Sequence, residues 1–199
     1  GIPVAAAPAP AAAQEPWTLL ETVRASVAEA GPMSARFVQT YVPAGFSSGE
    51  KESGELAIAL PDCLRFDYQE PYQKSFLLCG DTAHYWNRDD KTGRRYAVDR
   101  SQEPGLDLVL LGLSDLETRY EAVAKGAGDG RTAVTLTPKG ERRELASATL
   151  TIDRGSRRLV ELSYSDLEGN RTHFTITGYR AIRDGARFQP PKGIEWRED

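Results

Sequence analysis

The sequence predicts a mainly β protein with some α-helix, an antiparallel sheet of about ten to eleven strands with short helices on its concave side. Apolar and polar residues alternate with a period of two in many short segments, which is typical of strands with two different faces. Turn-forming residues separate these segments at near-even spacing, which favours successive hairpins. Residues 16–30 and 106–120 are apolar in patterns that fit helices instead.

The clearest strand pattern lies in residues 60–86. Large apolar residues occupy every second position of its first strand, and a turn follows at Pro71, whose ring fixes φ and removes a donor. Residues 75–79 then run back, and residues 83–86 form a third strand rich in aromatic residues. The segment therefore predicts three consecutive antiparallel strands that present large side chains to one face.

Cys63 and Cys79 are equally distant from the turn at Pro71 and therefore face each other in the predicted hairpin. Opposed residues of antiparallel strands lie about 4.5–5.5 Å apart at Cα, which is within reach of a disulfide. A cross-strand disulfide formed in an oxidising compartment is one interpretation, and two buried free thiols are the other.

The N-terminal part begins with residues 1–14, which are rich in Ala and Pro and which we expect to be a flexible leader behind a removed signal peptide. Helical spacing of apolar residues predicts a helix over residues 16–30. A strand over residues 34–42, an exposed loop over residues 44–53 and a strand over residues 54–60 are expected next.

Residues 106–113 are apolar nearly all round and short, so they do not fit the strand pattern. We expect a second short helix to start at Asp115 with Ser114 as its cap. Such short helices persist only when their leucines are buried. The sequence therefore predicts a lid of two helical turns over residues 106–120.

Strands with hairpin turns account for most of the remaining chain. After a polar turn over residues 87–95, strands are expected over residues 96–99, 120–124, 132–138, 148–153, 159–165, 171–180 and 186–188.

Length and composition are those of one domain, which we expect over residues 15–199. The formal net charge of −4 argues against a nucleic-acid partner, which would favour a basic surface. No apolar run approaches the roughly 20 residues of a membrane-spanning helix. Two cysteines do not provide a zinc site, and no cofactor is expected.

The sequence contains no nucleophile elbow, phosphate-binding glycine loop or metal-ligand cluster. His84 and His173 are interpreted as partly exposed strand residues, although either could act in catalysis. Asp166 and Glu168 flank a turn, where capping explains them better than a catalytic carboxylate pair. The sequence therefore does not predict an enzyme.

Several short motifs resemble one known family. They are the strand LRFDYQEP in residues 60–86 with the strands after it, FVQ at residues 37–39, LTPK at residues 136–139, DLEGNRT at residues 166–172 and FQPPKG at residues 188–193. In this order they resemble the periplasmic outer-membrane lipoprotein carrier proteins (LolA). The resemblance implies an incomplete, strongly curved antiparallel half-barrel, lidded by helices, that holds lipoprotein acyl chains in transit between membranes.

The strand phases and the resemblance together predict an acyl-chain cavity between the sheet and the helices, while a filled hydrophobic core is the alternative. The expected cavity residues are Leu56, Ile58, Phe66, Tyr68, Phe76, Leu78, Tyr85, Val134 and Leu136, and the expected lid residues are Leu19, Val23, Val27, Leu106, Leu108, Leu110, Leu111 and Leu116.

By resemblance, the protein is a periplasmic monomer of a Gram-negative bacterium. It receives triacylated lipoproteins from an inner-membrane ABC-type release complex and gives them to an outer-membrane receptor lipoprotein. Members of the family commonly have a basic residue before the proline that stands here as Pro61, and it ties the sheet to the lid. This chain has Leu60 there, so the latch is either weaker or made by another group, for which Arg65 is the candidate.

Two alternative functions are also compatible with the sequence. A receptor-type or bifunctional relative would insert cargo into the outer membrane, with Phe46 in an apolar loop as the residue that enters the bilayer. A protein-binding or stress-sensing module of the cell envelope could use the same fold without carrying lipid.

Overall fold

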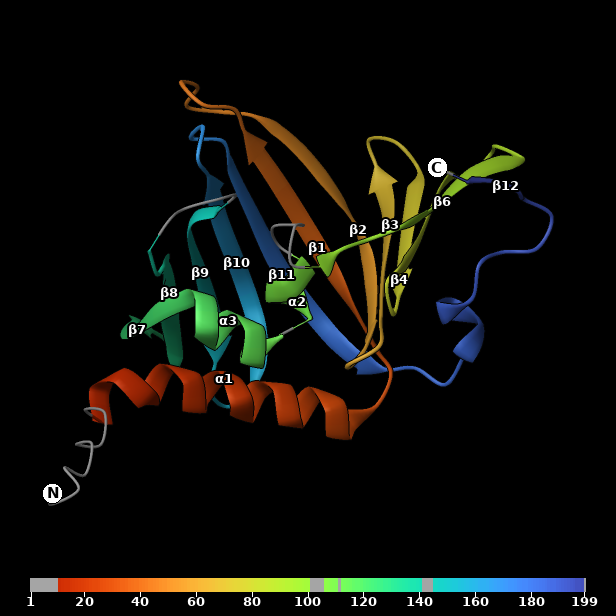
Figure 1. Ribbon diagram of the computed structural model, residues 1–199. Coiled ribbons are helices and arrows are strands. Elements are labelled where there is room, and N and C mark those ends of the chain that lie inside the picture. The colour runs from red at the N-terminus through yellow and green to blue at the C-terminus, as the bar shows by residue number, and fades with distance from the viewer. Residues whose placement is uncertain (1–10, 101–105, 111, 141–144, 199) are drawn as a thin grey trace, which may run out of the picture.

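The computed structural model describes residues 11–100, 106–110, 112–140 and 145–198. It contains a single sheet of twelve strands in the order β12-β6-β5-β4-β3-β2-β1-β11-β10-β9-β8-β7. The sheet is open and strongly curved, and the helices α1 (Ala11–Ala30), α2 (Leu106–Val109) and α3 (Leu113–Arg119) lie on its concave side (Figure 1). This architecture confirms the predicted fold class.

Neighbouring strands are antiparallel except for β12, which runs parallel to β6. The strands are β1 (Met33–Val42), β2 (Glu50–Ala59), β3 (Cys63–Glu70), β4 (Lys74–Cys79), β5 (Thr82–Asn87), β6 (Thr92–Ala97), β7 (Tyr120–Gly128), β8 (Arg131–Pro138), β9 (Leu145–Asp153), β10 (Arg158–Asp166), β11 (Arg171–Ala181) and β12 (Glu195–Glu198).

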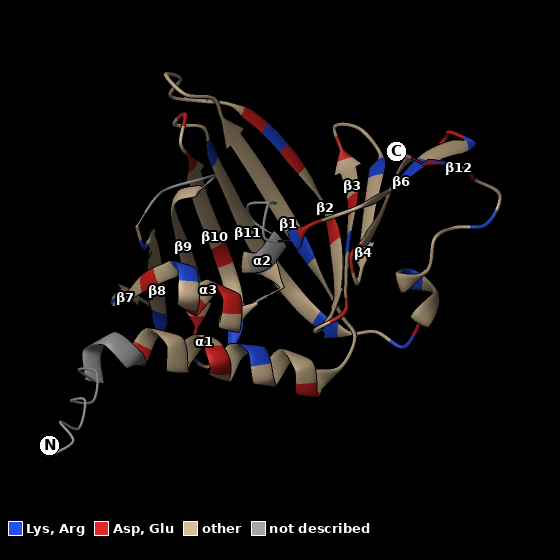
Figure 2. Ribbon diagram, viewed as in Figure 1, with Lys and Arg blue, Asp and Glu red and all other residues tan. Residues whose placement is uncertain are grey.

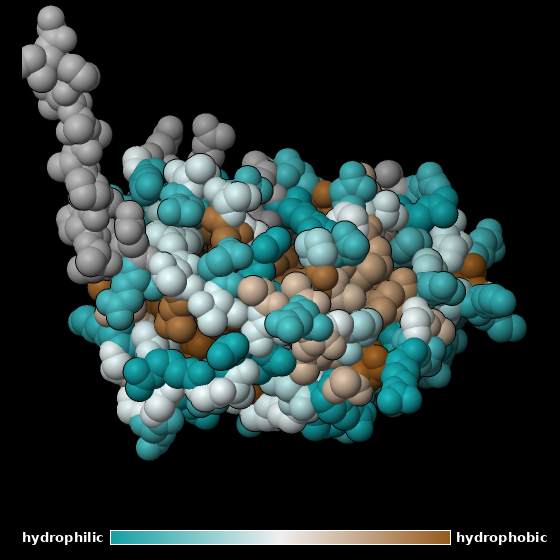
Figure 3. Space-filling view, turned by 90° about the horizontal axis from the view of Figure 1, so that it is seen from below, coloured by the Kyte–Doolittle hydropathy of each residue, from teal (hydrophilic) through white to brown (hydrophobic). Residues whose placement is uncertain are grey.

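The helices are α1 (Ala11–Ala30), α2 (Leu106–Val109), α3 (Leu113–Arg119) and the 3₁₀ helix η2 (Gly185–Phe188). α1 runs along the lower edge of the sheet, with α3 above it and α2 nearer the centre of the curve (Figure 1). Seen from the α1 side, hydrophobic residues show between hydrophilic ones (Figure 3). Acidic and basic residues are dispersed over both helices and strands (Figure 2).

Irregular pairing contributes to the curvature of the sheet. The register shifts between Ser53 and Gly54, where β2 pairs with β3, and such bulges bend a strand and increase its twist. A Cβ atom at Gly54 would lie 1.9 Å from the carbonyl oxygen of Asp67. Only glycine therefore allows the two strands to approach at this point.

Several predicted boundaries were wrong at the N-terminal end and in the middle of the chain. α1 starts at Ala11, so it takes up four residues of the expected leader. β2 starts at Glu50, because the charged residues placed in a loop pair with β1. β6 likewise starts at Thr92 and pairs with β5, although its residues are mostly polar.

Helix starts and the C-terminal region also differ from expectation. α3 starts at Leu113, and its N-cap is Gly112 rather than Ser114. Residues 186–188 are helical rather than extended, because the Asp184 side chain accepts a hydrogen bond from the backbone of Ala186. The strand β12 had not been predicted.

Candidate functional site

The concave face of the sheet carries continuous apolar rows. Leu56, Phe66, Phe76 and Tyr85 lie directly opposite one another across β2 to β5, and the next row contains Ile58, Leu64, Leu78 and Ala83. Val134 and Leu136 extend the same buried layer on β8. Eight of the nine expected cavity residues belong to one hydrophobic cluster or pack against it. The ninth, Tyr85, lies opposite Phe76 and continues the first of the two rows.

An aromatic group forms the centre of this face. The ring of Phe37 meets the rings of Phe66 and Tyr68 edge to face, with centroids 5.2 and 5.0 Å apart. Phe174 lies 5.9 Å from Phe66 and 6.2 Å from Phe37. Sequence reasoning missed Phe37 and Phe174, although each occupies an apolar position of a period-2 run that could have identified it.

The helices bury their apolar side chains against this face. On α1, Val23 and Val27 are buried as expected, and Leu20 is more buried than the expected Leu19, which is partly buried. Leu108, Leu110 and Leu116 are buried as predicted for the lid, together with Leu113. The expected Leu111 lies outside the described residues, and the same holds for the side chain of Leu106.

A small cavity of about 20 Å³ lies between α1, α2 and the sheet. Val23, Val27, Ile58, Leu60 and Val109 are among the residues that line it. This volume suffices for about one water molecule and is far too small for an acyl chain. At this place the helices are closed onto the sheet.

Polar groups appear where the aromatic cluster ends. The Tyr68 hydroxyl donates a hydrogen bond of 2.5 Å to Oε1 of Gln39. The Lys74 ammonium lies 2.8 Å from a carboxylate oxygen of Glu52 and 4.7 Å from the centre of the Tyr68 ring. Burial raises the pKa of Tyr68, and the nearby Glu52 carboxylate raises it further. The concave face thus has an apolar centre and a polar margin.

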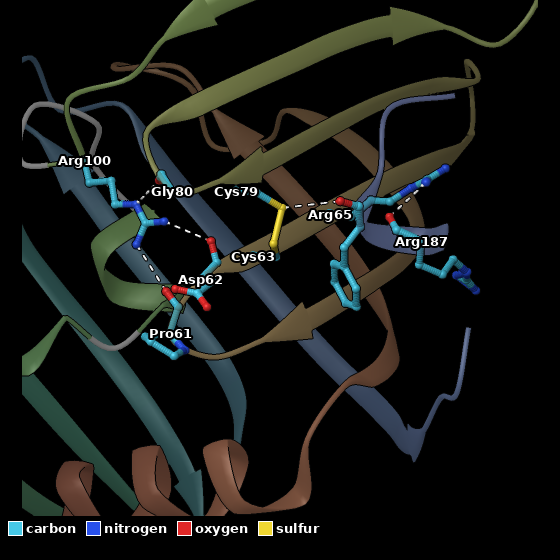
Figure 4. Close-up of a disulfide and its surroundings, with 9 residues drawn as sticks. Pro61, Asp62, Cys63, Arg65, Cys79, Gly80, Arg100 and Arg187 are labelled. Atoms are coloured by element: carbon cyan, nitrogen blue, oxygen red, sulfur yellow. Dashed lines mark hydrogen bonds between the residues drawn. A yellow bond between two sulfur atoms is a disulfide. The ribbon is translucent and has the colours of Figure 1, made fainter. Parts of the chain in front are cut away.

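Arg65 contacts the 3₁₀ helix η2 and not the helices of the expected lid. Its guanidinium donates to the carbonyl oxygen of Arg187 at 3.1 Å (Figure 4). It also binds the carboxylate of Asp67 at 2.9 Å and lies 5.2 Å from the centre of the Trp86 ring. These contacts lie on the convex face, because Arg65 alternates with the buried concave residues of β3. The expected latch between Arg65 and the lid is therefore not formed in this structure.

Arg100 binds the turn that follows Leu60, the position at which members of the family commonly have a basic residue. It donates to the carbonyl oxygens of Gly80, Asp62 and Pro61 at 2.8, 3.1 and 3.3 Å (Figure 4). Because Arg100 lies shortly before α2, these bonds tie the chain leading to the lid to two turns of the sheet. Leu60, next to Pro61, faces the small apolar cavity instead of supplying a cation.

Cys63 and Cys79 are joined by a disulfide between β3 and β4, as the hairpin register predicted (Figure 4). Phe188 of η2 lies beside it, with its carbonyl oxygen 3.6 Å from Sγ of Cys79. The C-terminal segment therefore covers the disulfide.

The residues considered for catalysis have structural partners. His173 Nδ1 lies 2.5 Å from Ser163 Oγ, and the His84 ring packs edge to face on Trp196. Asp166 caps its turn by accepting bonds from Glu168 and Asn170, and the bond from the Asn170 side chain is the main reason that its pKa is lowered. In the described part of the chain, no group of His, Cys, Asp and Glu could hold a metal ion.

Comparison with known proteins identifies the family. The family model described as "Outer membrane lipoprotein carrier protein LolA" matches residues 28–189. The chain belongs to this family. An outer-membrane lipoprotein carrier protein of Chromobacterium violaceum is 27% identical over 194 residues, which cover 96% of this chain and 89% of the relative. One of Xanthomonas campestris pv. campestris (strain B100) is 26% identical over 170 residues, with 82% and 80% covered.

Solved structures support the fold. An uncharacterised conserved protein of Thermus thermophilus gives a TM-score of 0.63 at 11% identity and covers 94% of this chain and all of its own length, 100%. MucB gives a TM-score of 0.53 at 13% identity, with 94% of this chain and 66% of MucB covered. Of the helices in the described residues, none has the length and apolar character needed to cross a bilayer.

Proposed function

We propose that this protein is a periplasmic carrier that binds the acyl chains of lipoproteins between its sheet and its helices and moves them from the inner to the outer membrane. The observation that carries the proposal is the continuous apolar layer on the concave face, covered by helices that are separate elements rather than part of the sheet. Acyl chains need dry surface rather than specific polar contacts, and each buried methylene contributes roughly 0.8 kcal/mol.

Binding in this proposal requires the helices to move, because the cavity beneath them is too small in the closed form. α1 and α3 are the elements to separate, since a groove of about 520 Å³ already lies between them, with Trp17 and Leu113 in its walls. Cargo then replaces the leucines of α2 and α3 on the sheet. The measured affinity is that of the open cavity reduced by the cost of opening, which also favours release.

Arg100 supports this movement as a fixed point. Its three bonds hold the chain before α2 to the sheet, so that α2 and α3 move about a defined end. The supplier in this scheme is an inner-membrane ABC-type release complex and the acceptor is an outer-membrane receptor lipoprotein. Both are inferred from the family.

Native mass spectrometry of the protein with a triacylated lipopeptide in dilute detergent tests the proposal. We expect a one-to-one adduct that is displaced by an apolar dye. A non-acylated peptide of the same sequence is the control and should give no adduct. A bare mass under all conditions, without dye uptake, would favour a protein-binding module of the cell envelope on the same fold.

Substitutions at two neighbouring residues distinguish a ligand cavity from a packed hydrophobic core. Phe76 faces the concave side, whereas Leu77 is fully buried on the convex side of the same strand. We expect Phe76→Ala to weaken lipopeptide binding and to lower the free energy of unfolding by much less than the about 3–5 kcal/mol of a packed core position. Leu77→Ala should cost about 2–5 kcal/mol and leave binding intact. The reverse pattern, measured by urea unfolding and dye displacement, excludes the cavity.

The exposure of Phe46 favours a second candidate, insertion of cargo into a membrane. Phe46 is 66% exposed in the loop between β1 and β2. If the protein acts as a receptor or as carrier and receptor in one, Phe46→Glu should abolish delivery to vesicles while uptake of lipopeptide persists. Equal loss of delivery and uptake removes this candidate.

A further inference from the structure

A polar pocket of about 380 Å³ lies on the convex face, on the side of the sheet opposite to the apolar layer. Its walls include Thr40, Thr149, Ser163, Ser165, Arg171 and His173. The strand register explains why they meet, since Thr40, His173, Ser163 and Thr149 lie opposite one another across β1, β11, β10 and β9. Residues that are far apart in the sequence thus form one site.

The chemistry of this pocket favours an anion. Its lining residues include a guanidinium, an imidazole and several hydroxyl groups, and none of them carries a carboxylate. Lys51 lies directly opposite Thr40 on β2 and adds a second cation at the margin. Glu161, a carboxylate of β10 on the same face, lies opposite Thr175, two residue pairs along the strands from Ser163 and His173, and is not among the lining residues. Converging donors of this kind bind phosphate groups.

An exposed apolar tip lies beside the pocket. Phe46, Leu167 and Tyr41 are 66%, 47% and 39% exposed. The loop after β1 and the turn after β10 lie at the same end of the sheet (Figure 1), and the backbone NH of Ala44 donates to the Asn170 side chain at 2.9 Å. Arg171 joins tip and pocket, because it lines the pocket and donates to the carbonyl oxygen of Phe46.

We propose that tip and pocket together form a docking site for a phospholipid bilayer, in which Phe46 and Leu167 enter the interface and a headgroup phosphate occupies the pocket at Arg171 and His173. Apolar side chains and nearby cations act together in such interfacial binding. The chain as a whole is acidic, with a formal net charge of −4, so overall attraction to an anionic membrane does not explain docking and a local site is needed. The proposal does not depend on acyl carriage.

Co-sedimentation of cargo-free protein with vesicles tests the site. Vesicles of phosphatidylethanolamine and phosphatidylglycerol should bind the wild type. A double variant, Arg171→Gln with His173→Gln, should bind at least about fivefold more weakly, since each cation near an anionic surface contributes about that factor. Phe46→Ser with Leu167→Ser should reduce binding by a similar or larger factor.

Matched controls remove the same charge or apolar surface elsewhere. Arg131→Gln changes an exposed arginine at the start of β8, away from the pocket, and Val123→Ser changes a side chain of β7 that is 58% exposed. Both controls should bind vesicles like the wild type. Circular dichroism melts establish that each variant is folded.

The outcomes are distinct. Loss of vesicle binding in both the pocket and the tip variants, with the controls unchanged, supports the proposal. Unchanged binding of the pocket variant overturns it, even if the tip variant binds less. Inorganic phosphate is titrated against the His173 ring by NMR, and a response to phosphate without any binding to vesicles also overturns it in favour of a soluble anion. Because no lipopeptide is present, these results are independent of the carrier test.

Discussion

The two halves of the sheet have similar concave faces and different convex faces. In the half formed by β2 to β6, buried residues also occur on the convex side, among them Asp67, Leu77 and Trp86, and η2 and β12 cover them. In the half formed by β1 and β7 to β11, the convex side carries half-buried or exposed hydroxyl groups such as those of Thr149 and Ser163. One half is therefore sealed on both sides, and the other offers its outer face to solvent and partners.

Ion pairs and aromatic contacts together stabilise the half formed by β2 to β6. Arg65 binds both Asp67 and the backbone of Arg187, and Arg187 in turn pairs with Glu55 at 2.8 Å. Trp196 of β12 contacts Trp86 edge to face with ring centroids 5.7 Å apart. Contacts that cover the convex face are thus concentrated in β2 to β6, while the proposed docking site lies on the half without this cover.

The largest effect is expected at Asp67. Asp67→Ala leaves the partly buried Arg65 without its carboxylate and Ser75 without its acceptor, so the free energy of unfolding should fall by about 3 kcal/mol or more. Thr149→Ala in the open half should change it by no more than about 0.5 kcal/mol. Urea unfolding of both variants measures the difference, and equal losses would contradict the distinction between the halves.

Loss of the disulfide should have the next largest effect. The disulfide between Cys63 and Cys79 closes a loop with a sequence separation of 16, for which chain entropy predicts a stabilisation of about 3 kcal/mol. Unfolding in the presence and absence of a thiol reductant measures it. The double variant Cys63→Ser with Cys79→Ser is the control and should not respond to the reductant. If the wild type is equally stable in both buffers, the disulfide does not contribute to the free energy of unfolding.

Gly93 tests the cover provided by β12. A Cβ atom at Gly93 would lie 2.4 Å from Cζ3 of Trp196, so Gly93→Ala should cost about 1–3 kcal/mol through overpacking. Only part of this cost should disappear when Gly93→Ala is made in a Trp196→Ala background, because a Cβ atom at Gly93 would still lie 2.9 Å from the carbonyl oxygen of Tyr85. Gly126→Ala in β7, where a Cβ atom meets nothing within 4 Å, should be nearly neutral. A cost that is unchanged without Trp196 would place its origin elsewhere.

The smallest effect concerns pH and His84. Burial lowers the pKa of His84 from its ordinary 6.5, and the adjacent Arg95 lowers it further. Because the folded pKa is depressed, the unfolded chain binds the proton more tightly, and stability is complete above pH 6.5 and declines as pH falls from there toward the folded pKa. His84→Gln should remove this part of the pH dependence. Identical stability profiles of variant and wild type between pH 5 and 7.5 would contradict it.

The sequence by itself determined the local features of this protein. Alternation in residues 60–86 predicted which side chains of β3 and β4 share a face, and the position of Pro71 predicted the pairing of Cys63 with Cys79. These features depend on neighbours within one hairpin, where side-chain period and turn position fix the register. The burial of the lid leucines Leu108, Leu110 and Leu116 followed from their apolar pattern in the same way.

Only the tertiary structure decided which partners meet across long distances in the chain. Arg65 was expected to act as a latch and instead binds Asp67 and Arg187, and the chain after β11 returns to the far edge of the sheet, where β12 pairs with β6. The convex pocket joins Thr40 to Thr149, Ser163 and His173 through the pairing of four strands. Local patterns do not encode such contacts, because they follow from the order of the strands and the curvature of the completed sheet.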